Sequence, residues 1–128
     1  MDKITRKVYY YDTDAGGLVY HSNYLKYFEE GRTTFFEKRG VDIPSLLNQG
    51  YFLVVRRTEI DYIAPARYGD IIEIVSHLDF ISGVRVNFSY EITCNGKDIV
   101  RGKTLLVSVG ENMKPRRLPR EILDIFKS

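Results

Sequence analysis

The sequence predicts an α+β fold, in which one long amphipathic helix precedes a series of antiparallel strands. Two observations support this prediction. Apolar residues recur at helical spacing between Tyr24 and Phe35, and β-branched and aromatic runs separated by turn residues fill the chain from Val54 to Val109. Because an amphipathic helix must bury its apolar stripe, we expect the helix to pack on the concave side of the sheet.

The first half of the chain is expected to hold one strand and the long helix. Residues 3–11 alternate between apolar and polar side chains, as a half-buried strand does. Ser22 or Asn23 is expected to cap a helix of about 16 residues, which ends at Arg39-Gly40 with a basic last turn and a glycine. Residues 44–50 favour a further short helical turn, since Pro suits its first position and Gly its end.

The second half changes to strand periodicity. Asn95-Gly96 is its strongest turn signal, because a type I′ hairpin requires a positive φ at both central residues. We expect four long strands arranged as an antiparallel meander, followed by a short basic tail helix near residues 120–127. The expected strands are residues 54–63, 70–80, 84–94 and 97–109.

Composition limits the classes of function. A chain of 128 residues with 44% hydrophobic content predicts a single domain, residues 1–128, that is small for enclosing a large ligand alone. The net charge of +2 disfavours nucleic-acid binding. One cysteine, Cys94, and two histidines are too few for a disulfide or a zinc site, so no metal is expected. We find no apolar leader and no membrane span, and therefore expect a cytoplasmic protein.

The segment that carries chemistry is residues 9–32, which read YYYDTDAGGLVYHSNYLKYFEEGR. Asp12 and Asp14 stand beside a glycine pair and His21, directly before the predicted helix. A carboxylate can activate water or attack a carbonyl, and the free backbone N–H groups of a first helical turn can bind the resulting oxyanion. The pattern therefore fits acyl-transfer chemistry.

Simpler interpretations exist for the same residues. An aspartate in such a turn most often caps a helix or forms an Asx-turn, and a lone histidine is usually a surface or core residue. His77 keeps that simpler interpretation. The glycine pair serves the turn rather than a phosphate, because no Lys-Ser/Thr follows it as in a P-loop.

The order of elements resembles the hotdog fold, in which a long antiparallel sheet wraps around one central helix. The pattern Tyr-x-Asp-Thr-Asp-Ala-Gly-Gly-x-Val-Tyr-His-x-x-Tyr at residues 10–24 resembles the signature of the 4-hydroxybenzoyl-CoA thioesterase-like family. Further likeness, at residues 52–56, 62–67 and 113–119, is closest to the Tol-Pal-associated acyl-CoA thioesterases of the YbgC type. The resemblance covers nearly the whole chain.

The resemblance implies roles for particular residues. Asp14 would be the catalytic carboxylate, either attacking the thioester carbonyl or activating water, while Asp12 is structural. A backbone N–H near His21 would bind the oxyanion, and the His21 side chain would support catalysis. The substrate-binding candidates are Gly17, Val19, Tyr20, Tyr24 and Arg56, the last as one of several basic residues suited to the phosphates of coenzyme A.

The function that the resemblance implies is hydrolysis of an acyl-CoA thioester without a cofactor, at a site between two subunits of a homodimer or homotetramer. Two alternatives remain open. One is a hotdog dehydratase acting on hydroxyacyl thioesters, and the other is a non-catalytic module that binds acyl-CoA or a protein partner.

Overall fold

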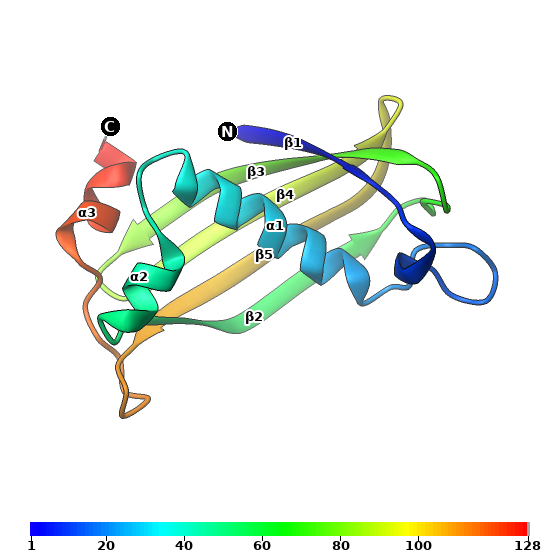
Figure 1. The fold of residues 1–128 in the computed structure, drawn as a ribbon. Coiled ribbons are helices and arrows are strands. Elements are labelled where there is room, and N and C mark those ends of the chain that lie inside the picture. The colour runs from blue at the N-terminus through cyan, green and yellow to red at the C-terminus, as the bar shows by residue number, and fades with distance from the viewer. Residues whose placement is uncertain (128) are drawn as a thin grey trace.

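The computed structural model describes the backbone of residues 1–127 and the side chains as far as Ile125. A five-stranded antiparallel sheet curves around one long helix, α1, which confirms the predicted α+β class (Figure 1). The strands are β1 Asp2–Lys7, β2 Phe52–Tyr62, β3 Ile71–Ser82, β4 Arg85–Cys94 and β5 Lys97–Val109. The helices are α1 Asn23–Glu37, α2 Ile43–Asn48 and α3 Arg120–Leu123, with 3₁₀ turns at Tyr10–Asp12 and Asp124–Lys127.

The strand order in the sheet is β1-β3-β4-β5-β2, so the predicted four-strand meander is wrong in one respect. β3, β4 and β5 do follow one another through hairpins, and Asn95 and Gly96 have the positive φ values (51° and 77°) that were expected of the second turn. β2, however, pairs with β5 at the far edge. Residues 63–70 must therefore cross the end of the sheet from β2 to β3, which brings them to the beginning of α1 (Figure 1).

The first strand is shorter than its alternation predicts. β1 ends at Lys7, and Tyr10, expected on a strand face, lies in a 3₁₀ turn with 73% of its surface exposed. The cause is the Asp12 carboxylate, which accepts a hydrogen bond from the Tyr9 N–H (2.9 Å). It takes the place of the backbone carbonyl that a neighbouring strand would otherwise supply.

Both ends of α1 differ from the prediction in one respect. Ser22 occupies the N-cap position but forms no side-chain cap, and Asn23 Nδ2 donates instead to the carbonyl oxygen of Asp12 (2.7 Å). The predicted side-chain cap is therefore wrong. At the other end Gly40 has φ 78°, as expected, but α1 already ends at Glu37, so the predicted basic last turn is wrong.

The core lies between α1 and the concave face of the sheet. Two glycines let the layers approach closely, because a Cβ on Gly31 would overlap Ser76 Oγ and one on Gly102 would overlap the Phe28 ring. α1 lies over β3 and β1 more than over β2. The buried side chains include Tyr27, Phe28, Phe35 and Phe36 of α1 and Ile72, Ile74, Val86, Phe88, Tyr90 and Ile92 of the sheet. Within residues 1–127, no helix is long and apolar enough to cross a membrane.

Candidate active site

The turn before α1 is held in place by backbone hydrogen bonds from two directions. Within the turn, the Asp14 N–H donates to the Leu18 carbonyl (2.8 Å), and Gly17, at φ 77°, adopts a backbone conformation that favours glycine. From outside, Val19 N–H donates to the Ala66 carbonyl (2.9 Å) and Tyr68 N–H to the Gly17 carbonyl (3.0 Å). The crossing segment 63–70 therefore fixes the position of the turn.

Asp14 combines a structural contact with a free oxygen. Its Oδ1 accepts hydrogen bonds from the N–H groups of Gly16 (2.8 Å) and Leu18 (3.3 Å), which is the Asx-type turn expected for such a residue. Its Oδ2 accepts no hydrogen bond from the described residues, and the side chain is exposed. One oxygen thus anchors the carboxylate while the other remains available for chemistry.

The backbone at the beginning of α1 offers hydrogen-bond donors beside this carboxylate. The Tyr20 N–H is used, since it donates to the Asp12 carbonyl (2.9 Å). Within residues 1–127, the N–H groups of His21 and Ser22 have no hydrogen-bond acceptor. The His21 carbonyl accepts a hydrogen bond from the Tyr62 hydroxyl (3.0 Å), which holds the His21–Ser22 peptide, the one that carries the Ser22 N–H.

One surface pocket brings the two predicted catalytic residues together. Asp14 and His21 line an open hollow of about 320 Å³, together with Val19 and Tyr24, two of the predicted substrate-binding residues. The His21 ring packs on Tyr20 with centroids 4.4 Å apart and meets Tyr62 edge-on at 6.5 Å. The remaining lining residues are Leu18, Tyr62, Ile63, Ala64 and Pro65.

Residues 62–65 are the part of the pocket that the sequence did not assign to the site. They belong to the run Tyr62-Ile63-Ala64-Pro65-Ala66-Arg67, which supported the family resemblance but suggested no chemistry. Their contribution follows from the crossing connection, because it carries them to the turn that holds Asp14. They supply apolar walls and, through Tyr62, one hydrogen bond to the His21 backbone.

Three predicted substrate-binding residues do not line this pocket. Gly17 shapes the turn, and Tyr20 supports the His21 ring. Arg56 lies in the register shift of β2, six residues from Tyr62, which at about 3.3 Å per residue places it roughly 20 Å away. A role for Arg56 in substrate binding stays a prediction and would require a second subunit.

Asp12 has a structural environment, as expected. It is 5% exposed, and its Oδ2 receives the Arg6 guanidinium (2.5 Å) as well as the Tyr9 N–H. Arg6 also contacts the Glu30 carboxylate (3.2 Å) and lies over the Tyr27 ring at 4.8 Å. Burial alone would lower the pKa of Arg6, but the bonds to Glu30 and Asp12 outweigh it and raise the pKa, so the guanidinium stays charged. This cluster ties β1 to α1.

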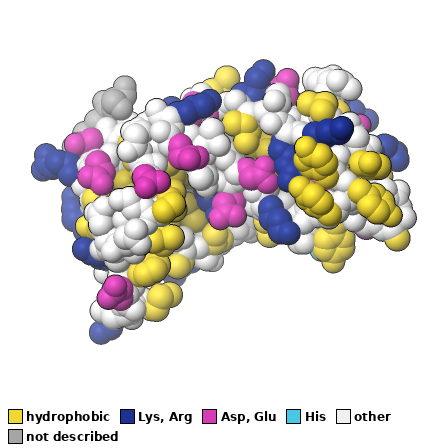
Figure 2. Space-filling model, viewed as in Figure 1, with side chains coloured by type: hydrophobic (Ala, Val, Ile, Leu, Met, Phe, Trp, Pro, Cys, Tyr) yellow, Lys and Arg dark blue, Asp and Glu magenta, His cyan; other side chains and the backbone are white. Residues whose placement is uncertain are grey.

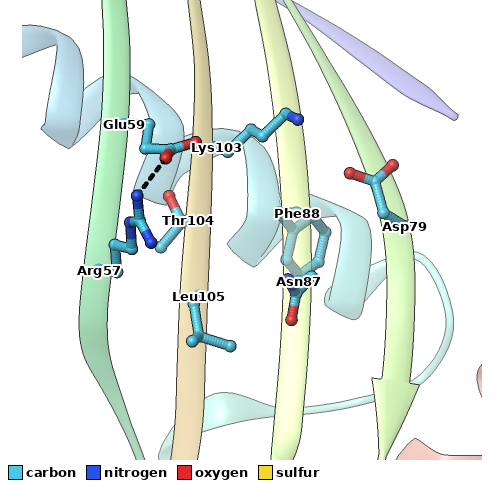
Figure 3. A pocket seen from close by; sticks show the side chains of 8 residues that line it. All are labelled: Arg57, Glu59, Asp79, Asn87, Phe88, Lys103, Thr104 and Leu105. Carbon is cyan, nitrogen blue, oxygen red and sulfur yellow. Dashed lines mark hydrogen bonds and ion pairs between the residues drawn. The ribbon is translucent and has the colours of Figure 1, made fainter.

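A separate depression lies on the sheet face opposite α1 (Figure 3). Its charged residues largely neutralise one another, as in the Arg57–Glu59 ion pair at 2.6 Å, with Lys103 and Asp79 nearby. It contains no histidine or cysteine and no helix N-terminus. The Asp14 pocket is therefore the better candidate for catalysis.

Hydrophobic side chains gather at the end of the molecule where α1 begins (Figure 2). The exposed aromatic residues of this region come from β1's end, the turn and the crossing segment, and include Tyr9, Tyr10, Tyr11, Tyr20 and Tyr68. The pocket lies at the same end of the molecule, because its lining residues come from the turn before α1 and from the crossing segment.

Comparison with known proteins identifies relatives along nearly the whole chain. Residues 8–126 match the family model of the thioesterase-like superfamily. The acyl-CoA thioester hydrolase YbgC of Escherichia coli O6:H1 is 34% identical over 123 residues, covering 94% of this chain and 92% of the relative. The acyl-CoA thioesterase YbgC of Helicobacter pylori strain 26695 is 41% identical over 88 residues, covering 69% of this chain and 64% of the relative.

Solved structures show the same fold. A probable thioesterase from Bartonella henselae superposes with a TM-score of 0.86 at 33% identity, covering 92% of this chain and 98% of that one. A 1,4-dihydroxy-2-naphthoyl-CoA thioesterase from Synechocystis superposes with a TM-score of 0.91 at 23% identity, over 98% and 95% of the two chains, and supports the hotdog fold alone. The chain belongs to the thioesterase-like superfamily.

Proposed function

We propose that this protein hydrolyses acyl-CoA thioesters to the free acid and coenzyme A at the Asp14 pocket. The observation that carries the proposal is the pairing, on one pocket, of a carboxylate oxygen without a hydrogen bond and an unpartnered backbone N–H at the beginning of α1. Relatives that match nearly the whole chain are named acyl-CoA thioester hydrolases, which supports the substrate class.

The geometry suggests how the reaction proceeds. Asp14 Oδ2 takes a proton from water, the hydroxide oxygen bonds to the thioester carbonyl carbon, and the carbonyl oxygen becomes an oxyanion that accepts a hydrogen bond from the His21 N–H. Collapse of this intermediate breaks the C–S bond, and the thiolate of coenzyme A leaves with the proton that Asp14 Oδ2 took from water, which restores the carboxylate. In the other route Oδ2 attacks the carbonyl itself, and water then hydrolyses the mixed anhydride.

A labelling experiment separates these two routes. In a single turnover in H₂¹⁸O with excess enzyme, direct attack by water places ¹⁸O in the product acid. Attack by Asp14, followed by water adding to the aspartyl carbonyl of the anhydride, instead places ¹⁸O in Asp14, which mass spectrometry of the peptide detects.

The function itself is tested by thiol release from acetyl, branched, aromatic and long-chain acyl-CoAs with the wild type and Asp14→Asn. We expect hydrolysis by the wild type and loss of it in the variant, since general-base assistance contributes about 10²- to 10⁴-fold. Equal rates for both proteins would remove Asp14 from catalysis. Binding without hydrolysis would favour an acyl-CoA-binding module, and hydration or dehydration of hydroxyacyl-CoA would favour a dehydratase.

We further propose that two subunits share the site. β2 is an edge strand of 11 residues that pairs only with β5 in the described chain, and an uncovered strand of this length favours pairing with another strand. Antiparallel pairing of two β2 strands about their centre would place Tyr62 of one protomer opposite the partner's Phe52. The partner would then lie beside the Tyr62 end of β2, which lines the pocket.

The assembly is tested by light scattering over a range of protein concentrations. A dimer, or a tetramer built from two dimers, is expected, and a protein that is monomeric at the concentration at which it is fully active would contradict the shared site. A cytoplasmic location is part of the same proposal, because the free Cys94 thiol fits a reducing compartment. Fractionation of cells expressing the full chain would test the location.

A further inference from the structure

The Asn23 side chain reaches back to the start of the Asp14 turn instead of capping α1. Its Nδ2 donates to the Asp12 carbonyl oxygen (2.7 Å), and the same oxygen accepts the Tyr20 N–H (2.9 Å). A backbone carbonyl oxygen has two lone pairs, so both are in use. The residue two positions before Asp14 is thus joined to the first residue of α1 through one oxygen atom.

The acceptor of these two bonds is itself held in place. Asp12 is a buried residue, and its carboxylate accepts hydrogen bonds from the Tyr9 N–H and the Arg6 guanidinium. Its backbone forms part of the 3₁₀ turn Tyr10–Asp12. An acceptor fixed in this way does not follow a donor that moves, so the Asn23 side chain is held against a rigid point.

The peptide group that carries the His21 N–H is held by Asn23 from two directions. This peptide joins Tyr20 to His21, and its carbonyl oxygen accepts the backbone N–H of Asn23 (2.9 Å). The Tyr20 N–H, one peptide earlier, shares the Asp12 carbonyl with the Asn23 side chain. Because a peptide group is planar, fixing its carbonyl also fixes the direction of its N–H.

The Asp14 carboxylate is anchored by separate contacts. Its Oδ1 accepts bonds from the Gly16 and Leu18 N–H groups, and the Asp14 N–H donates to the Leu18 carbonyl (2.8 Å). None of these contacts involves Asn23. Loss of the Asn23 side chain would therefore move the His21 N–H relative to Asp14 rather than move both together.

We propose that Asn23 is a positioning residue, which holds the His21 N–H where it can bind the oxyanion while Asp14 acts on the same carbonyl group. This inference rests on the proposed function. Asn23 does not line the Asp14 pocket, so it acts through the backbone and not on the substrate. A misplacement of about 1 Å in such an arrangement can reduce the rate about 10²-fold.

The test compares two substitutions of Asn23. Asn23→Ala removes the donor, and Asn23→Asp keeps the shape but replaces the donor with a carboxylate oxygen. A carboxylate in the first turn of a helix is favourable, so Asn23→Asp separates the stability of α1 from the orientation of the peptide. Asn112→Ala is the matched control, because Asn112 also bonds to the backbone, at the Lys114 N–H (3.0 Å) in the loop after β5.

Thiol release from the best acyl-CoA substrate gives kcat and KM for each protein. We expect kcat to fall about tenfold to a hundredfold in both Asn23 variants, because the bond to the oxyanion forms only in the transition state. KM should stay within about twofold of the wild type, and Asn112→Ala should leave both constants within the same limit. The melting temperature should fall less in Asn23→Asp than in Asn23→Ala.

A second measurement needs no turnover. A ketone analogue of the substrate, with a methylene group in place of the sulfur and ¹³C in the carbonyl, is bound to each protein, and its infrared carbonyl frequency is recorded. A hydrogen bond to the carbonyl oxygen lowers this frequency. The lowering seen with the wild type and with Asn112→Ala should be smaller in both Asn23 variants, whereas a purely structural role for Asn23 would leave it unchanged in a folded variant.

Other outcomes would overturn the inference. A lower melting temperature with unchanged kcat and carbonyl frequency would assign Asn23 to the stability of α1 alone. A rise in KM without a fall in kcat would assign it to ground-state binding, and a loss of kcat confined to Asn23→Asp would reflect only the added charge. If Asn23→Ala does not fold, kcat and the carbonyl frequency of Asn23→Asp decide. If the wild type hydrolyses no acyl-CoA, the proposed function fails first, and the two failures are thereby distinguished.

Discussion

Replacing Arg6 with methionine removes the cation that neutralises Asp12 and keeps much of the apolar stem. The Arg6 and Asp12 side chains are 18% and 6% exposed, so the carboxylate would be left buried without a cation. Breaking such a buried pair costs about 3 to 5 kcal/mol. Because Arg6 is partly solvated and its second partner Glu30 is 40% exposed, we expect the lower end, about 3 kcal/mol.

The assay is urea unfolding followed by far-ultraviolet circular dichroism, with Asp12→Asn and the double variant completing a cycle. The double variant should lose less stability than the sum of the single variants, with a coupling of at least about 1 kcal/mol. Arg6→Met should also reduce kcat, because the Asp12 carbonyl holds Tyr20 and Asn23 at the beginning of α1. A loss below about 1 kcal/mol, as for an exposed ion pair, would refute the reasoning.

Three further changes have defined outcomes. Tyr62→Phe removes the bond to the His21 carbonyl and should lower kcat about threefold to tenfold in the thiol-release assay, with stability changed by less than about 0.5 kcal/mol. Gly102→Ala places a methyl group against the Phe28 ring and should cost about 1 to 3 kcal/mol in urea unfolding. Burial raises the pKa of the Cys94 thiol, so less thiolate is present at neutral pH, and its alkylation by iodoacetamide should still accelerate above pH 9.0.

Each of these three predictions has a control or an outcome that would contradict it. Tyr68→Phe alters an exposed tyrosine of the neighbouring crossing segment and should leave kcat unchanged, so equal losses for the Tyr62 and Tyr68 variants would discount the His21 contact. Gly110→Ala gives a methyl group with ordinary contacts and should cost clearly less than Gly102→Ala. An alkylation rate for Cys94 that levels off below pH 9.0 would contradict the effect of burial.

The elements of the fold followed from local patterns more readily than their pairing did. The stripe of α1 and the Asn95-Gly96 hairpin depend on residues close in sequence, and both were predicted correctly. The pairing of β2 with β5 depends on contacts between residues 38 to 57 positions apart, and strand periodicity carries no information about the partner. The early end of β1 was not predicted, because the Asp12 side chain accepts the hydrogen bond of the Tyr9 N–H in place of a neighbouring strand.

The candidate site likewise contains residues that local sequence predicted and residues that only long-range contacts bring in. Asp14 and His21 are seven residues apart in one motif, so the sequence alone placed them in one turn. Tyr62 and residues 63–65 reach the pocket only because the chain crosses the end of the sheet after β2. Most of these residues are apolar, and such residue types do not by themselves indicate a catalytic site. Arg56 lies along β2 away from the pocket, and its predicted contact depends on a second subunit.

The central claim is that the free oxygen of Asp14 acts on a thioester carbonyl held at the beginning of α1. It is tested most directly by kcat of Asp14→Asn on the best acyl-CoA substrate, because asparagine has the same shape and its side-chain oxygen can still accept the bonds from Gly16 and Leu18. We predict a loss in kcat of about 10²-fold or more with an unchanged melting temperature. A kcat within about twofold of the wild type would contradict the account.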